Sequence, residues 1–354
     1  MACPTPATAP LVAPTRTARD ARGRPLEDLR LSLTDRCNLR CAYCMPEEDY
    51  VWLPREDVLD AEEVERLVRA FVAVGVTKVR LTGGEPLVRA DAVEIVARLA
   101  AIPGVRDLAL TTNATLLAPR AAALAEAGLD RVTVSLDTLR PDRHRALTRR
   151  DNHAAALAGL RSLGEAGFRG TKVNAVVVRD VNDDELDDLL ALGAEVGAEV
   201  RFIEYMDVGG ATGWTQEAVV GAAEILERLA ARHGPIDAAP APPSAPARRY
   251  RLGDGRTFGI VSSVSAPFCH ACGRSRVTAD GRWFHCLYAA EGTDLRAPLR
   301  AGLGVAALAE QLAAGWAARA DQGAVDRLAA SPRAAVPVQV LRRDPHLEMH
   351  TRGG

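Results

Sequence analysis

Cysteine is the residue type in this chain best suited to chemistry, because six of its seven cysteines fall into two tight groups of three. Cys3 stands apart, and the two groups are Cys37, Cys41 and Cys44, then Cys269, Cys272 and Cys286. An odd number of cysteines arranged in this way makes a poor disulfide framework. In a chain of 354 residues without a recognisable secretory signal, such groups more often hold metal. We therefore expect two metal sites.

The first group has the spacing Cys-x3-Cys-x2-Cys within TDRCNLRCAYCMP, residues 34–46. Thiolates bind zinc as well as iron–sulfur clusters, but a structural zinc site takes four ligands. No histidine precedes His144, so no local histidine completes such a site. Three thiolates suit a 4Fe–4S cluster with one open iron, which can bind the amine and carboxylate of S-adenosylmethionine. A zinc loop and a chance cluster are the alternatives.

The second group, with spacing Cys-x2-Cys-x13-Cys, leaves two interpretations open. His270 and His285 are adjacent to its cysteines in sequence, so a zinc site of three cysteines and one histidine is one of them. The other is a second cluster whose open iron binds a substrate directly. Arg274 and Arg276 stand beside this group, and the planar guanidinium group binds phosphate or a purine edge well. The two arginines favour the second cluster, although solvated surface arginines are common in this chain.

Short apolar segments alternate with helical ones through the first two thirds of the chain. The expected strands are 29–34, 77–82, 107–113, 131–137, 172–178 and 199–206, and the expected helices are 60–74, 91–102, 117–127, 153–167 and 183–196. This alternation indicates a parallel sheet with right-handed crossovers. Six units are fewer than the eight of a closed barrel. The fold class that we expect is therefore α/β, an open, partial TIM-type (βα)6 barrel with a carboxy-terminal Fe–S-binding extension.

Ligands of such folds gather at the carboxyl ends of the strands, so residues there are candidates for a site. The first cysteine group follows the first strand, and TGGEP, residues 82–86, follows the second. Gly83 and Gly84 let the backbone approach a ligand without an intervening Cβ. Ser135 and Met206 close the fourth and sixth strands. Taken alone, each of these is more often a connector, a turn or a core residue.

The chain divides into four parts on composition. We expect a disordered leader at 1–26, the barrel at 27–235, a Pro/Ala linker at 236–249 and a carboxy-terminal region with the second cluster at 250–354. The leader is rich in arginine and poor in acids, which also fits a transit peptide. Further expected elements are an amphipathic helix at 214–233, a hairpin at 248–263 with a GDG turn, and a helix around 305–319.

Overall charge and hydropathy exclude some classes of function. The net charge of −2 gives no general attraction to nucleic acid or to an anionic membrane. No run of eighteen apolar residues predicts a membrane span. We therefore expect a cytoplasmic protein with no nucleic-acid or membrane partner, and any anion site must be local. Lys78 and Lys172 are the two lysines among 44 basic residues, which singles them out.

From Leu29 to Gly354 the chain resembles the GTP 3′,8-cyclase family (MoaA) of molybdenum cofactor biosynthesis, within the radical SAM superfamily. Both cysteine spacings, the TGGEP segment and the Gly-Gly end carry this resemblance. It implies that both cysteine groups bind 4Fe–4S clusters. The residues that match its S-adenosylmethionine contacts are Tyr43, Gly84, Ser135 and Met206. Those that match its GTP contacts are Arg30, Arg80, Thr111, Lys172, Arg201, Arg274 and Arg276, and the family's carboxy-terminal pair that inserts toward the active site matches Gly353 and Gly354.

The resemblance also implies a lyase reaction and its partners. Reductive cleavage of S-adenosylmethionine at the first cluster would give a 5′-deoxyadenosyl radical, which removes the 3′ hydrogen of GTP. Attack of C3′ on guanine C8 then yields 3′,8-cyclo-7,8-dihydro-GTP. An electron donor of flavodoxin or ferredoxin type, a homodimer and a downstream cyclic pyranopterin monophosphate synthase are expected partners. No GxxxxGK[ST] segment is present, so arginine and lysine must hold the triphosphate instead.

Two other functions compete with the cyclase. One is another radical SAM enzyme with an auxiliary cluster, such as a peptide maturase, although such enzymes often carry more carboxy-terminal cysteines than the three found here. The other is a non-catalytic iron–sulfur or zinc protein, which would need neither six βα units nor TGGEP. Release of 5′-deoxyadenosine separates these two classes.

Overall fold

Six βα units form the first part of the chain in the computed structural model, which describes residues 17–329 and 333–353. The strands are β1 (Asp28–Ser32), β2 (Lys78–Thr82), β3 (Asp107–Thr112), β4 (Arg131–Ser135), β5 (Lys172–Val177) and β6 (Glu199–Glu204). The helices are α1 (Ala61–Ala73), α2 (Ala92–Ala100), α3 (Ala121–Glu126), α4 (Pro141–Thr148), α5 (His153–Glu165), α6 (Leu186–Glu195) and α7 (Ala222–His233). Each strand expected from the sequence is present, within two residues at either end.

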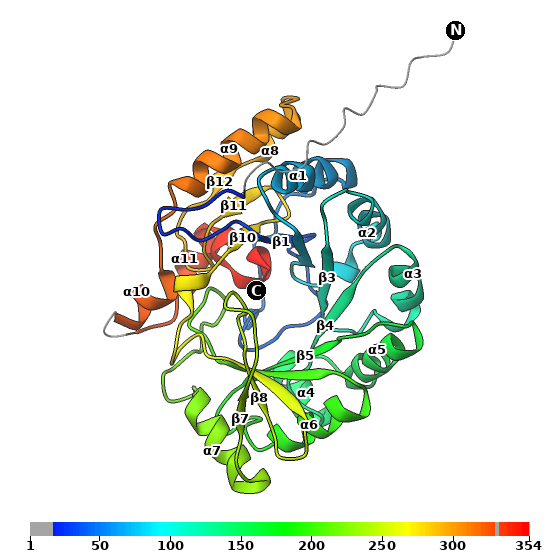
Figure 1. Cartoon of the computed structure of the whole chain (residues 1–354), viewed down its shortest axis with the longest axis vertical. Coiled ribbons are helices and arrows are strands. Elements are labelled where there is room, and N and C mark those ends of the chain that lie inside the picture. The colour runs from blue at the N-terminus through cyan, green and yellow to red at the C-terminus, as the bar shows by residue number, and fades with distance from the viewer. Residues whose placement is uncertain (1–16, 330–332, 354) are drawn as a thin grey trace.

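The carboxy-terminal region extends the same sheet instead of forming a separate layer. Its strands are β7 (Asp237–Ala239), β8 (Arg248–Arg251), β9 (Thr257–Val261), β10 (Arg274–Val277), β11 (Arg282–Phe284) and β12 (Thr293–Asp294). The strand order is β12-β11-β10-β1-β2-β3-β4-β5-β6-β9-β8-β7. Strand β10 is parallel to β1 and β9 is parallel to β6. The sheet curves into an open barrel with helices on its outside (Figure 1), which confirms the predicted fold class.

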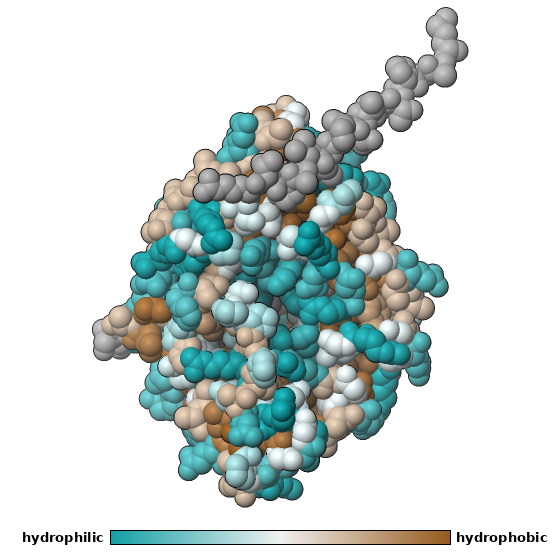
Figure 2. All heavy atoms as spheres, in the orientation of Figure 1, coloured by the Kyte–Doolittle hydropathy of each residue, from teal (hydrophilic) through white to brown (hydrophobic). Residues whose placement is uncertain are grey.

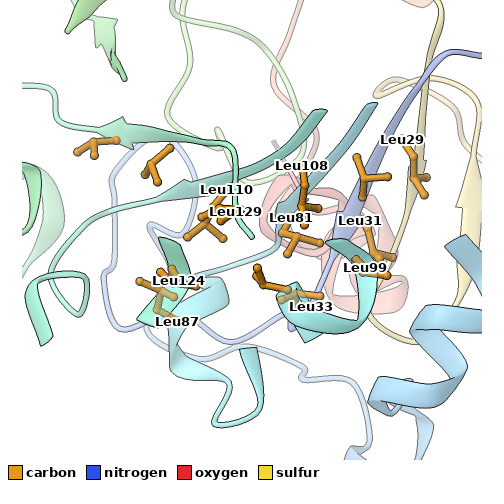
Figure 3. Close-up of a cluster of buried hydrophobic side chains, with 14 of the residues drawn as sticks. Leu29, Leu31, Leu33, Leu81, Leu87, Leu99, Leu108, Leu110, Leu124 and Leu129 are labelled. Carbon is orange, nitrogen blue, oxygen red and sulfur yellow. The ribbon is translucent and has the colours of Figure 1, made fainter. Parts of the chain in front are cut away.

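The two faces of the sheet differ in polarity. On β1, Leu29 and Leu31 are fully buried, and Figure 3 shows them in a leucine cluster with residues of β2, β3 and α2. Arg30 lies between these two leucines, so the alternation of a strand turns it to the opposite, inner face. Strands β2 and β5 repeat this pattern with Arg80 and Lys172. Apolar residues therefore hold the helices against the sheet, while the inside of the curve is lined with polar residues.

Two segments predicted to be irregular are structured. Residues 17–26 pack on the barrel, where Arg24 and Asp20 form a buried ion pair of 2.5 Å and Leu26 is fully buried. The Nε1–H of Trp316 donates to the carbonyl of Arg24 at 3.1 Å. The prediction of disorder is wrong for residues 17–26, because long-range contacts that composition does not reveal hold them. Within the expected linker, β7 pairs with β8. Residues 1–16, with Cys3, lie outside the described residues.

The structure differs from the expected helices in two places. The helix expected at 214–233 begins only at Ala222, because Trp214 is buried with its Nε1–H bonded to the carbonyl of Tyr205, and Val219 forms a bridge to Val178. Helix α4 was not predicted. The hairpin of β8 and β9 is confirmed, with Gly255 in the left-handed region at φ 89°.

Short helices complete the carboxy-terminal region. They are α8 (Arg296–Arg300), α9 (Val305–Ala317), α10 (Gly323–Ala329), α11 (Val338–Arg343) and α12 (Met349–Arg352). The 3-10 helices of the chain are η1 (Arg55–Asp57), η2 (Pro86–Val88), η3 (Ala118–Arg120), η4 (Cys269–Ala271) and η5 (Pro345–Leu347). The carboxy-terminal end lies inside the curve of the sheet (Figure 1). Among the described helices, none has the length and apolar character needed to cross a membrane.

Candidate active site

A cavity of about 500 Å³ occupies the inside of the open barrel. Both cysteine groups line it, together with residues from each of the six strands β1 to β6. The residues predicted to bind S-adenosylmethionine or GTP that line the cavity are Tyr43, Gly84, Ser135, Met206, Arg30, Arg80, Thr111, Lys172, Arg201, Arg274 and Arg276. Hydrophilic residues surround the middle of this face of the molecule (Figure 2). The fold thus brings the two groups, far apart in sequence, into one polar chamber.

The first cysteine group lies on a loop after β1 that is fixed by backbone hydrogen bonds. The amide of Cys44 donates to the carbonyl of Cys41 at 3.0 Å. Asn113, at the end of β3, lies with its side-chain amide 3.9 Å from the sulfur of Cys37. Burial raises the pKa of all three thiols, to about 11 for Cys37. Three convergent thiols fit an iron–sulfur cluster, which would have to displace their protons as it binds.

The two glycines of TGGEP fit against this loop. A Cβ on Gly84 would lie 2.4 Å from the carbonyl oxygen of Arg36, and one on Gly83 would lie 2.3 Å from that of Thr34. The amide of Gly84 donates to the Thr34 carbonyl at 2.9 Å. The glycines line the cavity as expected, but the structure adds a second reason for them. They let the loop after β2 touch the backbone of the cysteine loop.

Tyr43 is held by a buried carboxylate that the sequence analysis missed. Its hydroxyl donates to Oδ2 of Asp137 at 2.5 Å, while Oδ1 of Asp137 accepts from the amide of Val176 at 2.8 Å. Asn182 donates to the Asp137 carbonyl at 2.7 Å. Asp137 follows Ser135 by two residues at the end of β4, so its position at a strand end was the available signal. This network fixes the tyrosine between the second and third cysteines of the first group.

The second cysteine group is assembled from η4 and the end of β11. The guanidinium groups of Arg24 and Arg319 donate to the carbonyls of Cys269 and Cys272 at 3.0 and 2.9 Å. Burial alone would raise the pKa of Cys272, but Arg274 and then Arg319 lower it to about 6. The thiolate is the form that binds a cluster, and a lowered pKa makes this form easier to reach. This donor set of three cysteines therefore also fits an iron–sulfur cluster.

The zinc alternative finds no support at the second group. The His285 ring packs edge-on against Trp283, with centroids 4.3 Å apart, and also against Trp316. Its Nε2 is buried and has no hydrogen-bond partner among the described residues. Within 17–329 and 333–353, no three His, Cys, Asp or Glu side chains come close enough to hold a single metal ion.

Cations from three neighbouring strands stand side by side at the second group. Arg30 on β1 is in register with Arg276 on β10 and with Arg80 on β2. Burial, then Arg276 and Arg274, lowers the pKa of Arg30 well below its usual range. Burial and Arg274 lower the pKa of Arg276 to about 10. The Nε atoms of Arg30 and Arg274 are buried and have no partner among the described residues. Buried guanidinium nitrogens that lack a partner favour the binding of an anion.

A second set of cations lies farther along the sheet. Burial and the nearby Arg201 lower the pKa of Lys172 to about 8. Arg201 pairs with Glu199 at 3.0 Å. Lys78 and Arg131 also line the cavity; the sequence singled out Lys78 as a rare lysine but assigned it no role, and Arg131 was missed. Lys78 is the other lysine of the chain and opens a strand, and these two features could have identified it.

Thr111 and the carboxy-terminal tail are placed by hydrogen bonds. Nη1 of Arg80 donates to the hydroxyl of Thr111 at 3.3 Å. A Cβ on Gly353 would lie 2.1 Å from Cγ2 of Thr82, and Arg276 donates to the carbonyl of Gly353. The tail therefore ends against the inner ends of β1 and β2, beside the arginines. Gly354 lies outside the described residues.

Comparison with known proteins gives this architecture a class. The family model of the radical SAM superfamily matches residues 31–193, and the model described as Molybdenum Cofactor Synthesis C matches residues 198–325. Among solved structures, Streptococcus suis SuiB bound to S-adenosylmethionine aligns over 86% of this chain and 68% of its own, with a TM-score of 0.59 and 17% identity. That likeness shows the fold alone. An open parallel barrel with a cysteine loop after its first strand is thus the radical SAM fold.

Curated relatives narrow the class. A protein of Mycobacterium bovis named GTP 3′,8-cyclase 3 is 53% identical over 95% of this chain and 90% of its own. A GTP 3′,8-cyclase of Acidothermus cellulolyticus is 48% identical over 87% of this chain and 88% of its own. The chain belongs to the GTP 3′,8-cyclase family.

Proposed function

We propose that this protein is a GTP 3′,8-cyclase that converts GTP to 3′,8-cyclo-7,8-dihydro-GTP in molybdenum cofactor biosynthesis. The observation that carries this proposal is one chamber lined by both three-cysteine groups and by buried arginines, of which Arg30 and Arg274 have an Nε without a partner among the described residues. When bound, two 4Fe–4S clusters and S-adenosylmethionine supply the electron transfer and radical chemistry. The chain itself must orient GTP, hold its charge and keep water away.

The cysteines have the first role. Cys37, Cys41 and Cys44 hold the cluster that binds S-adenosylmethionine, with Tyr43, Gly84, Ser135 and Met206 around that molecule. Cys269, Cys272 and Cys286 hold the second cluster, which faces guanine. Because thiolates occupy three positions of each cluster, each leaves one iron for an external ligand.

The cations have the second role. Arg30, Arg274 and Arg276 lie beside the second cysteine group and bind the nucleotide there, while Lys172, Arg201 and Arg80 with Thr111 bind along the sheet. The negative charge of a triphosphate neutralises these buried cations. Because the guanine and the triphosphate are then both held, the ribose between them is fixed in position. The carboxy-terminal pair Gly353 and Gly354 serves the reaction as the family's tail does, and Gly353 lies against Thr82 at the end of β2. Exclusion of water protects a reactive radical.

Other partners follow from the reaction. A small flavodoxin- or ferredoxin-type protein supplies the electron, and a cyclic pyranopterin monophosphate synthase consumes the product. We further propose that the protein works as a cytoplasmic homodimer.

The deciding experiment measures 5′-deoxyadenosine released by the anaerobically reconstituted protein with S-adenosylmethionine and dithionite. Release should rise strongly with GTP and little with ATP or without nucleotide, and the product should be the cyclic nucleotide. The variant Cys286→Ala should lose GTP turnover while it keeps binding S-adenosylmethionine. Release that ignores GTP would disprove the cyclase and leave a radical SAM enzyme of another specificity. No release from fully loaded protein would favour a non-catalytic iron–sulfur protein.

A further inference from the structure

The cysteine loop of the first site reaches the protein surface at one point. Ala42, which lies between Cys41 and Cys44 in the sequence, is exposed. Its amide donates to the carbonyl of Leu147 at 2.9 Å, and the amide of Arg40 donates to that of Thr148 at 2.8 Å. Leu147 and Thr148 are the last two residues of α4. The end of α4 is therefore bound directly to the most exposed part of the cluster-binding loop.

This helix end carries a concentration of positive charge. Arg145, Arg149 and Arg150 are exposed, and the Arg149 side chain has no hydrogen bond or ion pair among the described residues. Asp151 is the acid beside them, at 4.0 Å from Arg145 and 77% exposed, which makes a weak pair. We call Arg145, Arg149 and Arg150 the basic corner. None of the three lines the cavity.

Neighbouring charges do not cancel the basic corner. Arg143 on the same helix is paired with Asp184, and Asp142 lies at the opposite end of α4. Glu47, the first acid after Cys44, is engaged elsewhere, because it accepts from the hydroxyl of Thr212 in the loop after β6. An approaching protein therefore meets a positive surface on the α4 side of the cysteine loop.

We propose that the basic corner is the docking site of a small acidic electron-carrier protein that reduces the cluster held by the first cysteine group. This inference rests on the proposed function, which needs one electron per S-adenosylmethionine cleaved. The reduced carrier loses one electron and the cluster gains it, and no bond or proton moves in that step. Complementary charge steers such an encounter and aligns the carrier with the exposed loop. The backbone contacts of Leu147 and Thr148 bring the docked protein next to the cluster ligands.

The test uses the reconstituted holoenzyme and a reduced flavodoxin. In the variant Arg145→Glu/Arg150→Glu, Arg149 is kept because its backbone is left-handed, with φ 54°. Its matched control is Arg248→Glu/Arg251→Glu, which reverses two exposed arginines on β8, near the far edge of the sheet. Stopped-flow bleaching of the cluster gives the reduction rate without GTP. Calorimetry with oxidised flavodoxin gives the dissociation constant.

We expect the basic-corner variant to be reduced by flavodoxin about tenfold more slowly at low salt and to bind it about tenfold more weakly. Its reduction by dithionite should change less than about twofold. The control variant should match the wild type, whose flavodoxin rate should fall as salt rises. Wild-type rate and affinity in the basic-corner variant would overturn the proposal, as would an equal loss with dithionite. The proposed function fails separately, by absence of GTP-stimulated 5′-deoxyadenosine from dithionite-reduced enzyme.

Discussion

Burial among like charges gives the individual side chains of this site their properties. Arg30 and Lys172 are ordinary cations in water, but desolvation and neighbouring arginines lower the pKa of both. Such groups destabilise the empty protein and gain most when a polyanion enters. The chemistry of these residues thus depends on what surrounds them more than on their type.

Lys172 gives the first prediction at this scale. Because its pKa lies at about 8, the amine is charged below that pH and loses its proton above it. The kcat/KM for GTP should therefore fall as pH rises through about 8, and Lys172→Arg should shift that decline to higher pH, since arginine stays protonated. Steady-state kinetics from pH 7 to pH 9.5 tests this. The same decline in Lys172→Arg would show that another group titrates.

The hydrogen bond between Tyr43 and Asp137 gives the second prediction at the residue scale. Asp137→Ala and Tyr43→Phe should each weaken S-adenosylmethionine binding by roughly tenfold, because each removes one partner of the hydrogen bond that orients the tyrosine. The double variant should be no weaker than either single one, as residues acting as a unit are not additive. Titration followed by the cluster's EPR signal measures affinity, and iron content serves as control. Additive losses, or loss of iron, would contradict this role.

At the scale of elements, loops after parallel strands build the site by touching one another. The loop after β2 lies on the cysteine loop after β1, and the cysteine loop is bonded to the end of α4. Similarly, Gly210 after β6 lies so close that a Cβ there would be 2.1 Å from the Cys44 carbonyl. The cysteine loop is therefore enclosed by backbone on two sides, and small residues at these contacts are required by space.

Gly84→Ala tests this packing. The new Cβ meets the backbone of Arg36, which cannot move aside as a side chain could. We expect a loss of roughly 1–3 kcal/mol in the free energy of unfolding and incomplete iron loading at the first site. Gly164→Ala in α5 is the control, because nothing lies within 4 Å of its Cβ. Denaturant titration and iron analysis measure both variants. Wild-type stability and iron content in Gly84→Ala would refute the packing argument.

For the whole molecule, the carboxy-terminal region completes the chamber from both sides. It adds β10 to one edge of the barrel and β9 to the other, and its tail ends inside. Asp207, after β6, ties this region down. Its carboxylate is fully buried and bonds to Arg327, Arg333 and the hydroxyl of Tyr288, two residues beyond Cys286.

Asp207→Asn should release this region, since two arginines lose their shared partner. We expect the protein to lose roughly 3 kcal/mol of stability and to be cut faster by trypsin at Arg327 and Arg333. The matched control is Asp254→Asn, which breaks an exposed pair with Arg256 and should cost under about 1 kcal/mol. Thermal unfolding and timed proteolysis measure both. Equal behaviour of the two variants would show that Asp207 does not anchor the region.

The sequence by itself determined much of this protein. Short apolar segments between helical ones predicted each barrel strand, because a strand covered by helices must carry apolar residues. The grouping of the cysteines predicted two metal sites, because thiolates that share a metal centre must come together, and the resemblance to a family then indicated that both centres are iron–sulfur clusters. Rare residue types, such as Lys172, identified part of the cationic lining.

Tertiary structure alone decided the rest. Residues 17–26 looked disordered, since the contacts that hold them lie almost 300 residues away at Trp316. Asp137 looked like any acid after a strand until the fold placed it against Tyr43. Within the described residues, the burial of the Nε atoms of Arg30 and Arg274 without a partner depends on which strands become neighbours. Local pattern cannot report such features, because burial and charge pairing are properties of residues brought together from distant parts of the chain.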